Sequence, residues 1–128
     1  MKRLRYKLTV LKSVFYVLYA VPKANYYISR PERYGYEKTY AYARRIMDTV
    51  RRKSRTDTVY TGNENLPQSG GYILYSNHQG KYDALGILLC HPKPCAVLWD
   101  KRSARRFLAR HVNKLIQGKE IDLVSVQF

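Results

Sequence analysis

Hydrophobic and polar positions follow two different patterns along the chain, one that predicts helices and one that predicts strands. Apolar residues dominate from Leu8 to Val21, where Lys12 is the single charged residue, and this run predicts a helix. After a break that begins at Pro31, apolar residues recur at steps of three and four, so we expect an amphipathic helix over 37–53. Its apolar face consists of Tyr36, Tyr40, Ala43, Met47 and Val50.

Short β-branched or aromatic runs, separated by turn residues, follow the second helix. They predict strands at 58–60, 72–76, 95–99 and 121–126. Two more helices are predicted, one from Asp83, which would cap it, to Leu89, and one from Ser103 to Leu115. Because strands that alternate with helices indicate right-handed crossovers, we expect an α/β fold with a mostly parallel sheet.

The patterns divide the 128 residues into three segments. We expect a basic, hydrophobic membrane-interface segment at 1–35, a basic amphipathic helix at 36–57 and an α/β domain at 58–128. The fourteen apolar-rich residues of the first segment would span about 21 Å as a helix, less than the ~30 Å hydrocarbon core of a bilayer. Such a helix can lie in the membrane interface but can hardly cross the membrane.

The positive charge is concentrated in the first half of the chain. The formal net charge is +15, and residues 1–60 hold 15 of the 24 Lys and Arg residues but only 4 of the 9 acidic ones. Ten of the 13 tyrosines lie in the same half. This mixture suits an anionic membrane surface or a nucleic acid, and a plainly solvated face is the third interpretation.

The two cysteines form no disulfide framework. Cys90 and Cys95 lie in one short CHPKPC stretch, and we interpret them as small apolar residues of a protein in a reducing compartment. His91, in the same stretch, lacks the second ligand pair of a zinc site, so we expect no metal site.

One short constellation, Asn77 to Asp83 with the sequence NHQGKYD, could carry chemistry. His78 and Asp83 are five residues apart, so on a helix their side chains would point ~140° away from each other. A loop between a strand and a helix allows them to pair, and Gly80 permits its tight backbone path. The Asp83 carboxylate would then fix the imidazole of His78, whose other nitrogen could act as a general base towards a hydroxyl.

The stretch around this motif resembles the start of the catalytic domain of lysophospholipid acyltransferases, and more narrowly the 1-acylglycerol-3-phosphate acyltransferase family. The family's first block is NHxxxxD, which NHQGKYD matches, and the resemblance extends from about Thr58 to Trp99. It implies that residues 58–128 are the N-terminal part of a glycerolipid acyltransferase-like αβ catalytic domain, preceded by a membrane-associating helical segment.

The resemblance also implies roles for the motif residues. His78 would deprotonate the hydroxyl of a lysophospholipid acceptor, and Asp83 would orient and balance the imidazolium. The acyl donor would be acyl-CoA or an acyl-carrier protein, with no bound cofactor and no covalent enzyme intermediate. Asn77 would support the loop, and Lys81 would either contact a phosphate or remain solvated. We therefore expect a phospholipid-biosynthesis enzyme associated with the cytoplasmic face of a membrane.

The later motif blocks of the family cannot be recognised in the sequence. Residues 118–128 occupy roughly the place of the second block but contain no arginine, so we expect a truncated domain. Two alternatives stay open: a catalytically inactive membrane-bound remnant, and a small basic nucleic-acid-binding module. The second lacks any RNP-type, KH-type or zinc-ligand pattern, which makes it the weaker alternative.

Overall fold

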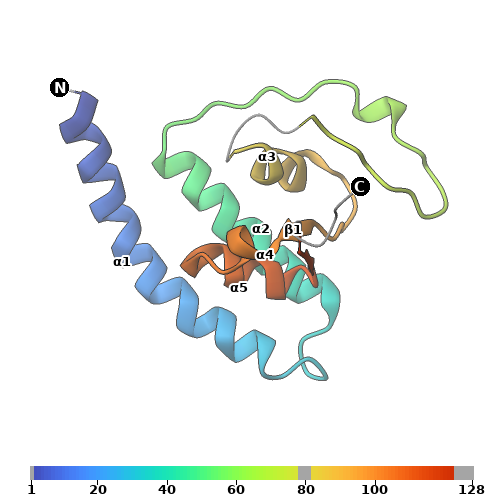
Figure 1. Ribbon diagram of the computed structural model, residues 1–128, viewed down its shortest axis with the longest axis horizontal. Helices are drawn as coiled ribbons and strands as arrows, with labels where there is room; N and C mark the ends of the chain where they lie inside the picture. The colour runs from blue at the N-terminus through green and yellow to red at the C-terminus, as the bar shows by residue number, and fades with distance from the viewer. Residues whose placement is uncertain (1, 78–81, 123–128) are drawn as a thin grey trace.

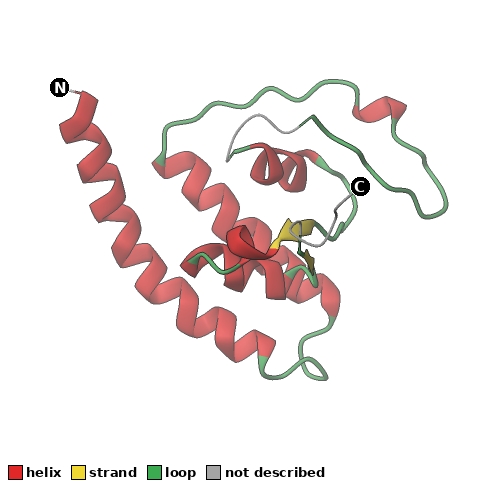
Figure 2. Ribbon diagram, viewed as in Figure 1, coloured by secondary structure: helices red, strands yellow, loops and turns green. Residues whose placement is uncertain are grey.

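The computed structural model describes residues 2–77 and 82–122, with side chains from residue 14 onward. Helices dominate this part of the chain, and the strands form one small sheet (Figures 1 and 2). In chain order the elements are α1 (Lys2–Ile28), α2 (Tyr36–Lys53), the 3₁₀ helix η1 (Asn63–Asn65), α3 (Asp83–Cys90), β1 (Leu98–Asp100), α4 (Lys101–Ala104), α5 (Phe107–Leu115) and β2 (Lys119–Ile121).

Helix α1 is longer than the sequence pattern predicts. It continues through Pro22 to Ile28, although proline removes one hydrogen bond from a helix interior. Ala20 and Ala24 on either side are fully buried, so packing on the other helices outweighs this local cost. Among the described residues, no helix combines the length and apolarity that crossing a membrane requires.

Helix α2 confirms the predicted amphipathic helix almost to the residue. Tyr40, Ala43 and Met47 of its predicted apolar face are buried, while Tyr36 and Val50 at the two ends are partly buried. The last turn of the helix contains three basic residues, and cations there interact favourably with the negative end of the helix dipole. The tyrosine and methionine stripe is therefore core rather than a recognition surface.

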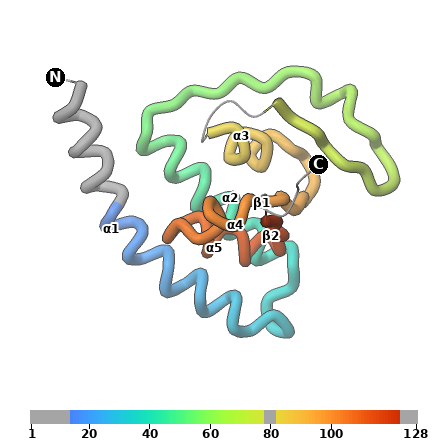
Figure 3. The backbone as a smooth tube through the Cα atoms, viewed as in Figure 1, coloured from blue at the N-terminus to red at the C-terminus, as the bar shows by residue number. Residues whose placement is uncertain are grey.

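One hydrophobic core joins helices from all three predicted segments. Helix α1 lies along α2 and α5 in Figures 1 and 3, and α2 also packs against α3. The largest fully buried side chains are Ile46, Leu88, Leu115 and Ile116. Full burial of such a side chain stabilises the fold by roughly 1.5–3 kcal/mol, so this cluster is the main source of stability.

The sheet is a single parallel pair, β1 and β2, with Trp99 opposite Glu120. Helices α4 and α5 connect the two strands, so the parallel crossover is confirmed for this unit. The predicted helix from Ser103 to Leu115 is in fact two helices, and α4 begins where Asp100 Oδ2 accepts a hydrogen bond from the Ser103 amide at 3.2 Å. The fold is thus mostly helical, with a sheet smaller than expected.

The predicted strands at 58–60 and 72–76 are not formed in the described part of the chain, where both runs are irregular (Figure 2). Val59 is 88% and Tyr75 92% exposed. β-Branched and aromatic residues favour a strand by packing on neighbouring strands, and here no neighbouring strand pairs with them. Composition alone was therefore a poor guide over this connection.

Candidate functional site

The NHQGKYD motif lies between an exposed connection and helix α3. Asn77 is exposed at the end of the connection, and Asp83 is the first residue of α3. His78, Gly80 and Lys81 lie outside the described residues, so the pairing of His78 with Asp83 stays a prediction. The helix expected after the motif is present, but the strand expected before it is not formed among the described residues.

Asp83 lies in the first turn of α3 rather than at its N-cap, which is Tyr82. The side chain of Asp83 is partly buried. A carboxylate in the first helical turn is stabilised by the positive end of the helix dipole, typically by about 0.3–1 kcal/mol. The start of α3 is therefore a suitable position for a carboxylate.

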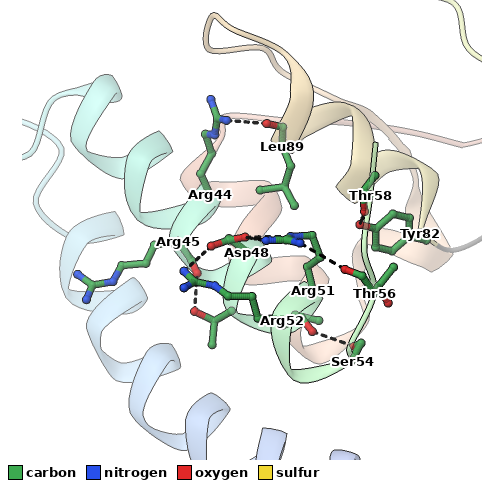
Figure 4. Close-up of polar contacts among 12 residues, drawn as sticks. Arg44, Arg45, Asp48, Arg51, Arg52, Ser54, Thr56, Thr58, Tyr82 and Leu89 are labelled. Atoms are coloured by element: carbon green, nitrogen blue, oxygen red, sulfur yellow. Dashed lines mark hydrogen bonds and ion pairs between the residues drawn. The ribbon is translucent and has the colours of Figure 1, made fainter. Parts of the chain in front are cut away.

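A hydrogen bond between two hydroxyls connects the start of α3 to the segment at 58–60. The hydroxyls of Tyr82 and Thr58 are 2.5 Å apart, so Tyr82 ties the motif region to that segment (Figure 4). Tyr60 lies beside them, and burial raises the pKa of its hydroxyl. Since an ordinary tyrosine is already protonated at neutral pH, the hydroxyl of Tyr60 can donate a hydrogen bond.

Arg44 of α2 fastens the other end of α3. Its Nη2 donates to the Leu89 carbonyl at 2.6 Å, and its Nη1 donates to the His91 carbonyl at 3.2 Å. Carbonyls at the end of a helix lack intrahelical partners and carry partial negative charge, so a guanidinium suits them. Both ends of α3 are thus held in place by side chains of the preceding segments.

Asp48 lies one turn beyond Arg44 and pairs with two other arginines. Its Oδ1 accepts from Arg51 Nη2 at 2.8 Å and from Arg51 Nε at 3.0 Å, while its Oδ2 pairs with Arg52. Arg51 also donates from Nη1 to the Thr56 carbonyl at 3.3 Å. The hydrogen bonds from Arg51 hold the pKa of Asp48 below its usual range, so the carboxylate is ionised at neutral pH.

These side chains surround an open cleft of about 420 Å³ between α2, α3 and the segment at 58–60. It is lined by Arg44, Arg45, Asp48, Arg51, Thr58, Tyr60 and Leu89. In Figure 4 the guanidinium of Arg45 points away from the centre of this cleft. The remaining arginines and hydroxyls supply hydrogen-bond donors, which fits an anion.

The sequence analysis did not single out this cleft. The signal was present, because Asp48 follows Arg44 by four residues and precedes Arg51 and Arg52 by three and four, so these side chains share one face of α2. The sequence pattern assigned the arginines only to a basic amphipathic helix. The contribution of residues 58–60, which come together with α2 only in the folded chain, could not be seen in the pattern.

His91 and the cysteines have structural surroundings. The buried ring of His91 lies with Nε2 2.7 Å from the Tyr72 hydroxyl and Nδ1 2.5 Å from the Lys93 carbonyl. Because a carbonyl only accepts, we assign the proton to Nδ1. Both cysteines are free thiols, and burial raises the pKa of Cys90, which keeps it protonated.

Two negative findings complete the description of the site. No group of three or more His, Cys, Asp or Glu side chains that could hold a metal ion occurs among the described residues. Comparison of the chain with protein families, with curated proteins and with solved structures finds no match in any of the three.

Proposed function

We propose that this protein transfers an acyl group from coenzyme A or an acyl-carrier protein to the free hydroxyl of a lysophospholipid such as lysophosphatidate. The observation that carries the proposal is the NHQGKYD motif, whose last residue, Asp83, begins α3. His78 removes the hydroxyl proton as the oxygen attacks the thioester carbonyl. An ester C–O bond forms, the C–S bond breaks, and the thiolate leaves with the proton from the imidazolium.

The surroundings of Asp83 support this role. The helix start favours its carboxylate, which would orient the imidazole of His78 and balance its charge after proton transfer. In this proposal Gly80 allows the turn between the two residues, Asn77 supports the loop, and Lys81 contacts the acceptor phosphate. The thiols of Cys90 and Cys95 take no part, because the acyl group passes directly to the acceptor.

The test compares acyl transfer to lysophosphatidate by the parent chain and by two single variants. His78→Ala removes the base, and we expect the rate to fall about 10²-fold or more. Gln79→Ala changes a variable position of the motif and should keep the rate of the parent. Equal rates for His78→Ala and the parent would reject the proposal, and a parent without turnover would favour the inactive membrane-bound remnant.

We further propose that α1 places the protein on an anionic membrane surface, at the cytoplasmic face. Four large apolar side chains form an exposed group on this helix, and Phe15 and Leu18 are 69% and 63% exposed. The group consists of Val14, Phe15, Leu18 and Tyr19. Exposed apolar groups of this kind, together with a net charge of +15, favour insertion into the interface of an anionic bilayer.

Vesicle binding tests this second proposal without removing residues that belong to the core. The double variant Phe15→Ser and Leu18→Ser should weaken binding to vesicles of phosphatidylcholine and phosphatidylglycerol by at least about tenfold. Val59→Ser, at a position 88% exposed outside α1, is the matched control and should bind like the parent. Unchanged binding by the double variant would reject the role of α1. Binding that a nuclease abolishes would favour the nucleic-acid module instead.

A further inference from the structure

We propose that the cleft between α2 and the segment at 58–60 is a binding site for a phosphate monoester group. Neither residue of the proposed dyad is among those that line the cleft, and the site needs no acyl transfer to operate. Phosphate is a compact, multiply charged anion with several acceptor oxygens, and guanidinium groups are the side chains that match it best. The charge, the rigidity and the hydroxyls of the cleft each favour such a ligand.

The charge of the cleft is positive even though it contains a carboxylate. Arg44, Arg45 and Arg51 line the cleft, although the guanidinium of Arg45 points away from its centre in Figure 4. Three arginines and one carboxylate thus line the cleft, which leaves two positive charges. A dianionic phosphate monoester would match this excess, whereas a neutral or cationic ligand would not.

The arginines are held in position before any ligand arrives. The carbonyls of Leu89 and His91 fix Arg44, and Asp48 and the Thr56 carbonyl fix Arg51. These bonds use two of the five N–H donors of Arg44 and three of those of Arg51, so donors remain for a ligand. A guanidinium that is already ordered loses less side-chain entropy on binding.

The opposite wall adds donors without adding charge. Thr58 and Tyr60 line the cleft, and both carry hydroxyls. The hydroxyl of Tyr60 is protonated at neutral pH, as an ordinary tyrosine is, so it can donate to a phosphate oxygen. Cations on one wall and neutral donors on the other would surround the ligand on two sides.

Asp48 provides the sharpest test, because it competes with any anion for the same guanidinium groups. Asp48→Asn removes one negative charge from the cleft and releases donors of Arg51 and Arg52. If phosphate binds there, this variant should bind inorganic phosphate about tenfold more tightly than the parent. A merely structural ion pair would change the stability of the protein but not its affinity for phosphate.

The experiment is a calorimetric titration with inorganic phosphate at constant ionic strength. Besides Asp48→Asn, we expect Tyr60→Phe, which removes one donor, to weaken binding about threefold to tenfold. Arg110→Gln, which removes one exposed cation of α5 outside the cleft, is the matched control and should bind like the parent. If neither cleft variant shifts the affinity, or if Arg110→Gln weakens it as much as Tyr60→Phe does, the site is rejected.

Two additional binding measurements identify the source of the phosphate group. Glycerol 3-phosphate represents a soluble ligand, and vesicles with phosphatidate in place of phosphatidylglycerol represent a lipid headgroup. Tighter binding of either one, sensitive to Asp48→Asn and Tyr60→Phe, supports the site and names its ligand. Binding of neither would overturn the proposal, and a positive result would stand even if His78→Ala leaves acyl transfer unchanged.

Discussion

The helical core and the connection from residue 57 to 77 are held together in different ways. In the core, Ile46, Leu88 and Leu115 are almost completely buried, and contacts among apolar side chains hold the helices together. In the connection, by contrast, the large apolar residues Ile73 and Tyr75 are 76% and 92% exposed. The stability of the protein therefore resides in the helices, whereas the segment that leads to the motif adds little apolar burial.

A small number of polar contacts hold the connection in place. Asn63 donates to the Cys90 carbonyl at 3.2 Å, the Tyr72 hydroxyl lies 2.7 Å from His91 Nε2, and Lys93 donates to the Gln68 carbonyl at 2.6 Å. Each contact ends on α3 or just beyond it. Helix α3 thus links the two regions, which makes its attachment to α2 decisive for the geometry of the candidate site.

The largest expected effect comes from a cavity in the core. Ile46 is 1% exposed at the centre of α2, and Ile46→Ala would remove buried methylene groups that the surrounding helices cannot fully replace. We expect the free energy of unfolding to fall by about 3 kcal/mol. Urea denaturation followed by circular dichroism measures this change, and a loss below about 1 kcal/mol would contradict the assignment of the core.

The next effect tests the link between the regions. Arg44→Gln removes the guanidinium that bonds the carbonyls of Leu89 and His91, and we expect a loss of about 2 kcal/mol, since bonds to charged groups contribute more than neutral ones. The neighbouring Arg45→Gln is the control, because the Arg45 guanidinium points away from the cleft (Figure 4). Hydrogen exchange should show faster opening of α3 in Arg44→Gln only, and equal behaviour of both variants would contradict the link.

The same contrast separates what the sequence could predict from what it could not. Periodicity predicted α2 and its buried face, because the steps between Tyr36, Tyr40 and Ala43 depend only on helix geometry. The prediction of a strand at 72–76 was wrong, because a strand requires a partner strand, which local composition does not specify. For the candidate site, the sequence predicted the helix that begins at Asp83, but not the contacts of Arg44, which join residues 45 and 47 positions apart.

A third prediction uses pH to probe the tyrosines of the core. Burial raises the pKa of Tyr42 to about 12 and also raises that of Tyr36. The hydroxyl of Tyr42 stays protonated to higher pH in the folded chain than in the unfolded chain, where it ionises near pH 10. Its contribution to stability is therefore complete below about pH 10 and is lost as the pH rises through about 12. Tyr42→Phe should lose about 1 kcal/mol at neutral pH with the bond to the Ala20 carbonyl, and its stability should fall less steeply in alkali. Parallel pH profiles for the parent and the variant would contradict this account.

The smallest effects are expected in the connection itself. Ile73→Ser and Tyr75→Ser change large apolar side chains that are already exposed to solvent, so each should alter the free energy of unfolding by less than about 0.5 kcal/mol. Tyr72→Phe, in the same run, removes the hydroxyl that reaches His91 and should cost about 1 kcal/mol. Urea denaturation of the three variants side by side would show whether the connection is held by single polar contacts. A loss above about 2 kcal/mol for Tyr75→Ser would mean that its side chain is buried in solution, because removal of an exposed ring cannot cost that much.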